Sequence, residues 1–77
     1  MAKIPKNPLK DLRAYRESLR ENQSEFWGRF GVTQSGGSRY ESGRRVPRPI
    51  GMLIHLFFTE RINDLVLREA LKKVSKD

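Results

Sequence analysis

The first part of the chain carries apolar residues at a spacing of about 3.6, which predicts an amphipathic helix. Asn7 and Pro8 supply a cap followed by proline at the first helical position, so we expect the helix to begin there. Its buried face is marked by leucines with an aromatic or basic residue between them: Leu9, Leu12 and Leu19, with Tyr15 or Arg16.

Two short helices are predicted next. Asn22, with Glu25 three positions later, is a variant of the capping box and marks the start of a second helix. Thr33 caps a third helix, which Gly43 ends. The second helix ends at Gly31 and contains three aromatic residues: Phe26, Trp27 and Phe30.

The sequence SGRRVPRP, residues 42–49, is a connector, because its prolines exclude a regular helix. Pro49 opens a fourth helix through IGMLIHLFF, and Thr59 ends it and caps a fifth helix that reaches about Val74. The run MLIHLFF also has the composition of a strand, and period alone does not assign a short apolar run. We favour helix, because residues 60–74 hold many good helix formers and no turn signal.

The fifth helix carries more apolar residues than one neighbouring helix can cover. They occupy more than one stripe and predict a second buried contact. That contact is either a two-fold partner or further packing within the monomer. The residues are Ile62, Leu65, Val66, Leu67, Ala70, Leu71 and Val74.

The chain is strongly basic: its 77 residues include 16 Lys and Arg against 9 Asp and Glu, a net charge of +7. Residues 1–48 hold eleven of the basic and five of the acidic residues, so the positive charge is concentrated there. Such a surface favours a polyanion, nucleic acid before an anionic membrane. A solvated basic face that only aids solubility is the alternative.

Residue content argues against several functions. Without cysteine the chain has neither disulfides nor thiolate metal sites, which favours a cytoplasmic location. No acid pair, nucleophile–base pair or metal-binding cluster stands out, so we expect no enzyme activity, no metal and no cofactor. The one histidine, His55, lies in an apolar run, as a packed side chain does. The longest apolar run, Met52 to Phe58, is too short to span a bilayer, and we expect no membrane partner.

Residues 23–47, QSEFWGRFGVTQSGGSRYESGRRVP, resemble the helix-turn-helix core of the phage repressor and Cro family, also called the XRE family. The resemblance covers about residues 9–48 without gaps. It does not extend with any specificity to the C-terminal third. The positions that have characteristic residues in this family are occupied here by Gln23, Phe26, Gly31, Val32, Thr33, Tyr40, Glu41, Gly43, Arg44 and Arg45.

The resemblance and the helical pattern together predict an all-α fold, a compact five-helix domain that spans residues 1–77. The helix-turn-helix unit covers about residues 22–42. A helical segment at about 50–75 completes the core, and dimerisation is one of the two uses expected for its apolar surplus. The alternative is a three-helix core with a C-terminal β-hairpin.

The resemblance also implies that the N-terminal part of the third helix enters the major groove of DNA. Thr33 would cap it, and the exposed side chains would include a glutamine suited to adenine and an arginine suited to guanine: Gln34, Ser35, Ser38 and Arg39. Phosphate contacts would come from Gln23, Arg44 and Arg45. A solvated helix face and a flexible basic loop are the alternatives. An N-terminal arm with Lys3, Lys6 and Lys10 is a weaker candidate.

Two positions depart from the family pattern in a matched way. Trp27 stands where the family has a small residue, and Gly37 stands where it has a large aliphatic one. We expect the indole to fill the space that the aliphatic side chain would occupy. Gly36 would then allow the helix backbone to approach DNA or Trp27 closely.

Charged residues make a second set of expectations. Glu21 replaces an apolar residue of the family, which weakens one packing contact at the corner between the first two helices. Arg16 occupies the place of the family's internal arginine and should pair with Glu41. A buried pair of this kind fixes geometry more than it adds net stability.

These features predict a sequence-specific transcriptional regulator, a Cro-like repressor that binds a pseudo-palindromic DNA operator as a homodimer. We expect it in the cytoplasm, on the nucleoid. An antitoxin that binds its operator and also a toxin or other small protein is one alternative. A protein-interaction adaptor that uses the fold only as a scaffold is another.

Overall fold

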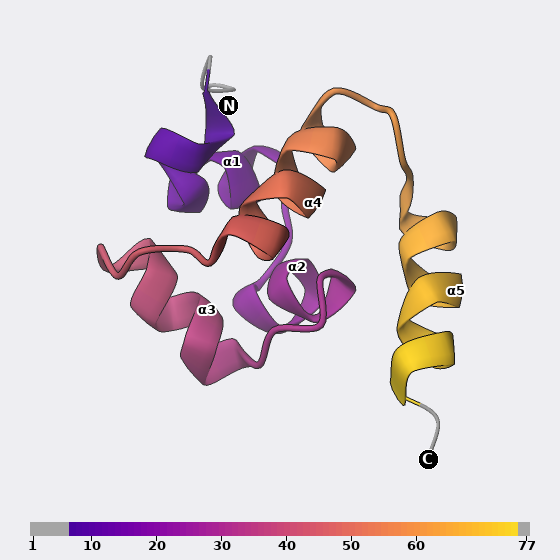
Figure 1. Cartoon of the computed structure of the whole chain (residues 1–77). Helices are drawn as coiled ribbons and strands as arrows, with labels where there is room; N and C mark the ends of the chain where they lie inside the picture. Colours follow the sequence, from indigo (N-terminus) through magenta and orange to yellow (C-terminus); the bar gives the residue numbers. More distant parts are fainter. Residues whose placement is uncertain (1–6, 76–77) are drawn as a thin grey trace.

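Every regular element in residues 7–75, the part of the chain that the computed structural model describes, is a helix (Figure 1). The predicted all-α fold is confirmed. The alternative C-terminal β-hairpin is wrong, because two helices occupy that region. No helix in residues 7–75 combines the length and apolar character needed to cross a membrane. The elements are a short 3₁₀ helix, η1 Pro8–Lys10, and α1 Leu12–Ser18, α2 Gln23–Arg29, α3 Gln34–Glu41, α4 Arg48–Phe58 and α5 Asp64–Ser75.

The predicted first helix is broken into η1 and α1. Asn7 caps η1 as expected, by accepting a hydrogen bond from the backbone N–H of Leu9 at 3.0 Å. Asp11 then leaves the helical region, with φ −149°. Its carboxylate accepts the backbone N–H of Ala14 at 3.0 Å and so caps α1 as a separate helix.

This break changes which side chains are buried. Leu12 and Tyr15 lie in the core and are 5% and 4% exposed. Leu9 and Leu19 are 40% and 37% exposed, so the predicted single face was wrong at both of its ends. The turn at Asp11 takes Leu9 out of register with the face of α1, and Leu19 lies past the last residue of α1, at its C-cap.

The caps of α2 and α3 are confirmed. The side chain of Asn22 accepts the backbone N–H of Glu25 at 2.8 Å, and the carboxylate of Glu25 accepts the N–H of Asn22 at 2.9 Å. This reciprocal pair is a complete capping box. Thr33 caps α3, because its hydroxyl oxygen accepts the N–H of Gly36 at 3.1 Å.

Each helix from α1 to α4 ends in the same backbone motif, in which a residue with positive φ lets two N–H groups bond back to the last turn. Gly31 (φ 77°) and Gly43 (φ 116°) serve α2 and α3, as predicted. Arg20 (φ 59°) and Glu60 (φ 61°) serve α1 and α4. A side chain in this conformation carries strain of about 1 kcal/mol or more, which the surrounding contacts offset.

The link between α4 and α5 differs from the prediction. Thr59 ends α4, but its hydroxyl donates to the carbonyl of His55 at 2.9 Å and does not cap the next helix. Asn63 caps α5 instead, by accepting the backbone N–H of Val66 at 2.9 Å. The fourth helix begins at Arg48, so the end of the connector belongs to α4.

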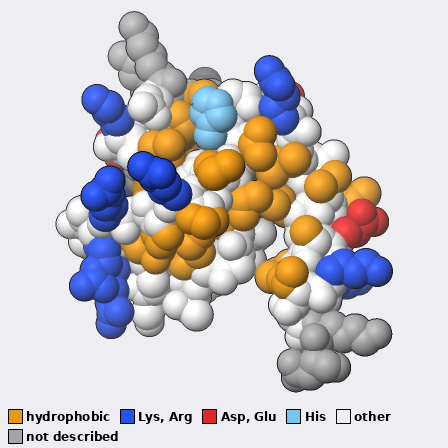
Figure 2. Space-filling model, in the orientation of Figure 1, with side chains coloured by type: hydrophobic (Ala, Val, Ile, Leu, Met, Phe, Trp, Pro, Cys, Tyr) orange, Lys and Arg blue, Asp and Glu red, His pale blue; other side chains and the backbone are white. Residues whose placement is uncertain are grey.

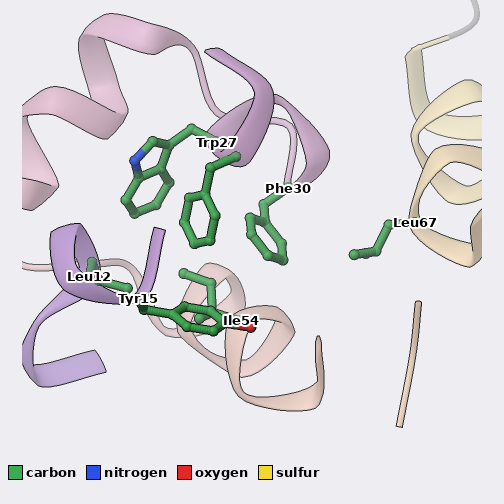
Figure 3. Packing of buried hydrophobic residues seen from close by; sticks show 7 residues of the cluster. Leu12, Tyr15, Trp27, Phe30, Ile54 and Leu67 are labelled. Atoms are coloured by element: carbon green, nitrogen blue, oxygen red, sulfur yellow. The ribbon is translucent and has the colours of Figure 1, made fainter. Parts of the chain in front are cut away.

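The core is mainly aromatic and is formed by α1, α2 and α4, with one leucine from α5 (Figure 3). The ring of Phe26 meets Tyr15, Trp27 and Phe30 edge to face, at centroid distances of 5.6, 5.2 and 5.3 Å. Pairs of this kind add about 0.5–1.5 kcal/mol each beyond area burial. The buried cluster comprises Leu12, Tyr15, Phe26, Trp27, Phe30, Ile54 and Leu67.

The exchange of size between Trp27 and Gly37 is confirmed. Trp27 is fully buried, and Gly37 is buried opposite it on α3. A Cβ built on Gly37 would lie 2.7 Å or less from Cγ, Cδ1 and Cδ2 of the indole, closer than real carbon contacts allow. The absent side chain at Gly37 therefore lets α3 lie directly against the indole of α2.

Arg29 of α2 ties α5 to the rest of the domain. Its guanidinium donates to Glu21 at 2.8 Å and to Asp64 at 2.7 Å, and it lies 4.6 Å from the ring centroid of Phe57. The hydrogen bond to Glu21 is the main cause that raises the pKa of Arg29, against the opposing effect of burial. Glu21 thus replaces the family's apolar contact with an ion pair, and a weakening of that corner stays a prediction.

The apolar surplus of α5 is only partly used within the monomer. Leu67 is buried, and Leu71 is half-buried, 3.5 Å from the position that a Cβ on Gly31 would take. Leu65, Val66 and Val74 remain 64%, 46% and 80% exposed. Packing within the monomer therefore does not account for the second stripe.

We expect Gly37→Ala to destabilise the domain by about 2–3 kcal/mol, because the new methyl group overlaps the indole ring. The matched control is Gly28→Ala in α2, where a Cβ meets nothing within 4 Å. That control should be neutral or stabilise by up to about 1 kcal/mol through helix propensity. Urea unfolding monitored by circular dichroism measures both, and equal effects would contradict the size exchange.

Arg29→Met should cost about 2 kcal/mol or more, because it leaves the half-buried carboxylate of Glu21 without its partner and leaves Asp64 with Arg68 alone. The control is Arg13→Met, since the Arg13 side chain is 69% exposed and lies 3.9 Å from Glu17. We expect that change to cost below about 0.5 kcal/mol. Hydrogen exchange should also show faster opening of α5 in Arg29→Met alone; unchanged exchange there would count against the tie.

Candidate nucleic-acid interface

A buried carboxylate fixes the position of α3. Glu41 is the last residue of this helix, and its side chain is 4% exposed. Arg16 of α1 donates to both carboxylate oxygens, from Nε at 2.8 Å and from a terminal nitrogen at 3.1 Å. The predicted pair is confirmed, and its bidentate geometry makes it a strong and directional contact.

Two further donors reach the same carboxylate, and the sequence did not indicate either. The indole Nε1 of Trp27 donates to Glu41 at 2.8 Å, and the side-chain amide of Gln23 donates at 3.2 Å. Trp27 therefore fills space with its ring and satisfies the buried anion with its N–H. A buried indole N–H needs a partner, and this rule is the signal that would have pointed to Glu41.

The electrostatics of this cluster favour the ionised form of Glu41. Burial by itself raises the pKa of the carboxyl. The hydrogen bonds from Arg16, Trp27 and Gln23, together with the charge of Arg16, outweigh burial and hold the pKa below its ordinary value. The carboxylate is therefore charged at neutral pH, and α3 is joined through it to α1 and α2.

With its inner face anchored, α3 turns a polar face to solvent. Gln34, Ser35 and Arg39 are exposed there, and Ser38 is half-exposed. Among residues 7–75 Arg39 takes part in no ion pair. The structure therefore brings together, on one exposed helix, the four side chains that the sequence selected for base contact.

Ser24 of α2 is a neighbour of this face that sequence reasoning missed. Its hydroxyl donates to the side-chain oxygen of Gln34 at 3.3 Å. Gln23, beside it, was expected to contact phosphate, yet its amide is engaged by Glu41. A phosphate contact from Gln23 stays a prediction and would use its backbone N–H or a rearranged amide.

Gly36 lies against its own turn rather than against the indole. A Cβ there would meet Val32 Cγ1 at 3.2 Å and Thr33 Oγ1 at 3.3 Å. The expected approach of Gly36 to Trp27 was therefore wrong, since Gly37 makes that approach. An approach of the Gly36 backbone to DNA stays a prediction.

The connector presents basic side chains directly after α3. The N–H of Arg44 donates to the carbonyl of Arg39 at 3.0 Å, and the N–H of Gly43 donates to that of Tyr40 at 3.2 Å. These bonds fold the connector back along α3 and leave the side chains of Arg44 and Arg45 exposed. Of the proposed N-terminal arm, Lys3 and Lys6 lie outside the described residues, and Lys10 is the exposed end of η1.

Two short helices joined by a glycine turn, the second with an anchored inner face and a polar outer face, define a helix-turn-helix domain. A comparison with models of protein families matches residues 13–57 to the RsaL-like HTH domain. The chain belongs to this family of helix-turn-helix domains, which supports DNA as its partner and regulation of transcription as its role. No curated protein and no solved structure shows a significant match to the chain.

The family match refines the resemblance noted in the sequence. It confirms a helix-turn-helix DNA-binding domain over more than half of the chain. It does not support the phage repressor and Cro family in particular. The motif of glycine turn, threonine cap and internal Arg–Glu pair therefore identifies the fold and not one particular family within it.

We expect Glu41→Gln to destabilise the domain by about 3–5 kcal/mol, because Arg16 would lose its buried charged partner. Glu25→Gln is the matched control, since the Glu25 carboxylate is exposed and accepts only one N–H in the capping box. That change should cost below about 1 kcal/mol. Denaturant unfolding compares the two, and similar losses would show that the Glu41 carboxylate is dispensable.

Stability should fall in acid in a way that depends on Glu41. Because the pKa of Glu41 is lower in the folded than in the unfolded chain, its contribution is complete above the ordinary glutamate pKa of about 4.3. It is lost as pH falls through the folded pKa. The difference in unfolding free energy between wild type and Glu41→Gln should therefore shrink below about pH 4. A constant difference from pH 7 to pH 3 would contradict this.

Proposed function

We propose that this chain is a sequence-specific regulator of transcription, a Cro-like repressor that binds a pseudo-palindromic operator as a homodimer through the major groove. It acts in the cytoplasm, on the nucleoid. The observation that carries the proposal is the anchoring of α3: Trp27 and Glu41 hold its inner face while Gln34 and Arg39 stand exposed on the other. A rigid helix holds such side chains in register with base edges.

The outer groups of α3 have the chemistry of base readout. Glutamine pairs with adenine through two hydrogen bonds, arginine pairs with guanine in the same way, and serine accepts or donates to either. The first turn of α3, capped by Thr33, directs a positive helix end toward phosphate. We assign the remaining contacts to the sugar–phosphate backbone of the DNA, where they position the protein without reading sequence. They come from Gln23, Gly36, Arg44 and Arg45.

A second copy of the chain supports the operator symmetry. Two copies would place their α3 helices in successive major grooves, about 34 Å apart. The exposed apolar residues Leu65, Val66 and Val74 of α5 favour such a partner, because a lone surface helix does not gain from exposing them. We assign the dimer contact to this face of α5.

An antitoxin is the second candidate, and the same α5 face favours it. A toxin or other small protein would cover Leu65 and Val66 while α3 binds the operator of its own operon. Co-purification of a small protein, lost in Val66→Asp but retained in Gln34→Ala, would favour the antitoxin over the simple repressor. An adaptor function would instead leave DNA unbound.

The test is a selection of bound sequences from a random duplex pool, followed by titration of the winner at several salt concentrations. We expect a pseudo-palindromic winner. Gln34→Ala and Arg39→Ala should each relax preference at one position per half-site, a loss of about 1–3 kcal/mol of discrimination. Preference that is unchanged in both variants would overturn the assignment of α3 as the reading helix.

Arg44→Ala and Arg45→Ala serve as the contrasting variants in the same experiment. Each should weaken all duplexes alike and reduce the slope of log affinity against log salt by about 1. Lys72→Ala on α5 is the matched control and should change neither preference nor slope. Absence of any enriched sequence from the wild-type selection would favour the adaptor.

A further inference from the structure

A groove runs along α4 on the side that faces η1 and the connector, with a volume of about 820 Å³. Leu9 and Met52 line it and are 40% and 65% exposed, and Val46 and Leu56 complete its apolar wall. Figure 2 shows hydrophobic side chains gathered across this face of the molecule, with Lys and Arg along the outer edge. The groove does not belong to the outer face of α3.

The rim of the groove is basic. Arg44, Arg45 and Arg48 line it, are exposed, and take part in no ion pair among residues 7–75. The two acidic residues at the same rim are already engaged: Asp11 caps α1, and Glu41 is bound by its buried donors. The charge left over for a ligand is therefore strongly positive.

One wall of the groove is a face of a helix. Its wall from α4 comes from Gly51, Met52, His55 and Leu56, which share one face of that helix. A helix of 11 residues such as α4 is about 16 Å long. A partner helix of about three turns therefore fits alongside it, in the helix-in-groove mode of recognition.

Charge decides against a second copy of this chain as the occupant. The chain carries a net charge of +7, and groove-to-groove contact would bring two sets of rim arginines together. α5 carries Arg68, Lys72 and Lys73 against Asp64 and Glu69, so docking its exposed apolar face in the groove would also add net positive charge to the rim. An acidic segment neutralises this rim.

We propose that this groove receives an acidic amphipathic helix of a partner protein, and that its occupancy excludes DNA. The apolar residues of the partner helix pack on Met52 and Leu9, and its carboxylates pair with Arg44, Arg45 and Arg48. The exclusion rests on the proposed function, because Arg44 and Arg45 are also the residues assigned to phosphate. The partner thus releases the operator by neutralising the positional contacts and leaves Gln34 and Arg39 untouched.

The test selects peptides from a display library of random 14-residue helical sequences against the full-length wild-type protein, in the absence of DNA. We expect winners that combine apolar residues at i, i+3 or i+4 and i+7 with a net charge of −3 or lower. Fluorescence anisotropy of a winner should show at least tenfold weaker binding to Met52→Asp and to Arg48→Glu. Leu19→Asp is the matched control, because Leu19 is an exposed apolar residue, 37% exposed, that lies outside both the groove and the α5 face; this variant should bind within twofold of wild type.

Several results would overturn the proposal. The first is the selection of neutral or basic peptides. The second is a selected peptide that binds Met52→Asp and wild type with equal affinity. The third is a library that yields no binding peptide. Concentration-dependent dimerisation of wild type that Met52→Asp abolishes would give the groove to a second copy and would equally overturn it. Circular dichroism confirms that each variant is folded.

A labelled operator duplex then tests the exclusion. A peptide selected from the library should displace the duplex from the wild-type protein. The same peptide with each Glu replaced by Lys should not. A ternary complex of peptide, protein and duplex would refute competition. Peptide binding is measured without DNA and duplex binding without peptide, so failure of this inference and failure of the proposed function are told apart.

Discussion

One buried anion organises this domain. The carboxylate of Glu41 receives Arg16, Trp27 and Gln23 at the point where α1, α2 and α3 come together. A buried carboxylate without partners would cost several kcal/mol, so the three helices are held to the one arrangement that supplies all its donors. The orientation of α3 toward solvent follows from that arrangement.

The glycine at position 37 of α3 follows from the same requirement. The indole that reaches Glu41 must pass between α2 and α3, and only glycine at position 37 leaves room for it. The helix gives up about 1 kcal/mol of propensity at this glycine and gains a fully buried tryptophan in return. A second charged residue, Arg29, plays the corresponding part for α5, through Glu21 and Asp64.

Most of the fold could be predicted from local chemistry. The Asn22 capping box, the Thr33 cap and the glycine at position 31 each act within a few residues, so the sequence reveals them directly. The misses lie at turns. Arg20 and Glu60 adopt positive φ without a glycine to mark the turn, so residue type gave no signal for them. Asp11, which sequence reasoning passed over, broke the first helix.

The candidate site divides in the same way. Its exposed members, Gln34 and Arg39, were found because the motif fixes their places on the helix. The bonds from Trp27 and Gln23 to Glu41 join residues far apart in the chain, and spacing carries no trace of them. The groove along α4 was likewise invisible, since it is assembled from η1, the connector and α4 only after folding.

The most direct test of this account is hydrogen exchange at the single tryptophan indole, followed by NMR. The Trp27 N–H is buried and donates to Glu41 at 2.8 Å, so its exchange should require global unfolding. The free energy of opening at this proton should equal the unfolding free energy from denaturant. Exchange that is much faster, at an opening energy close to that of surface amides, would mean that the indole does not hold Glu41, and the central claim would be wrong.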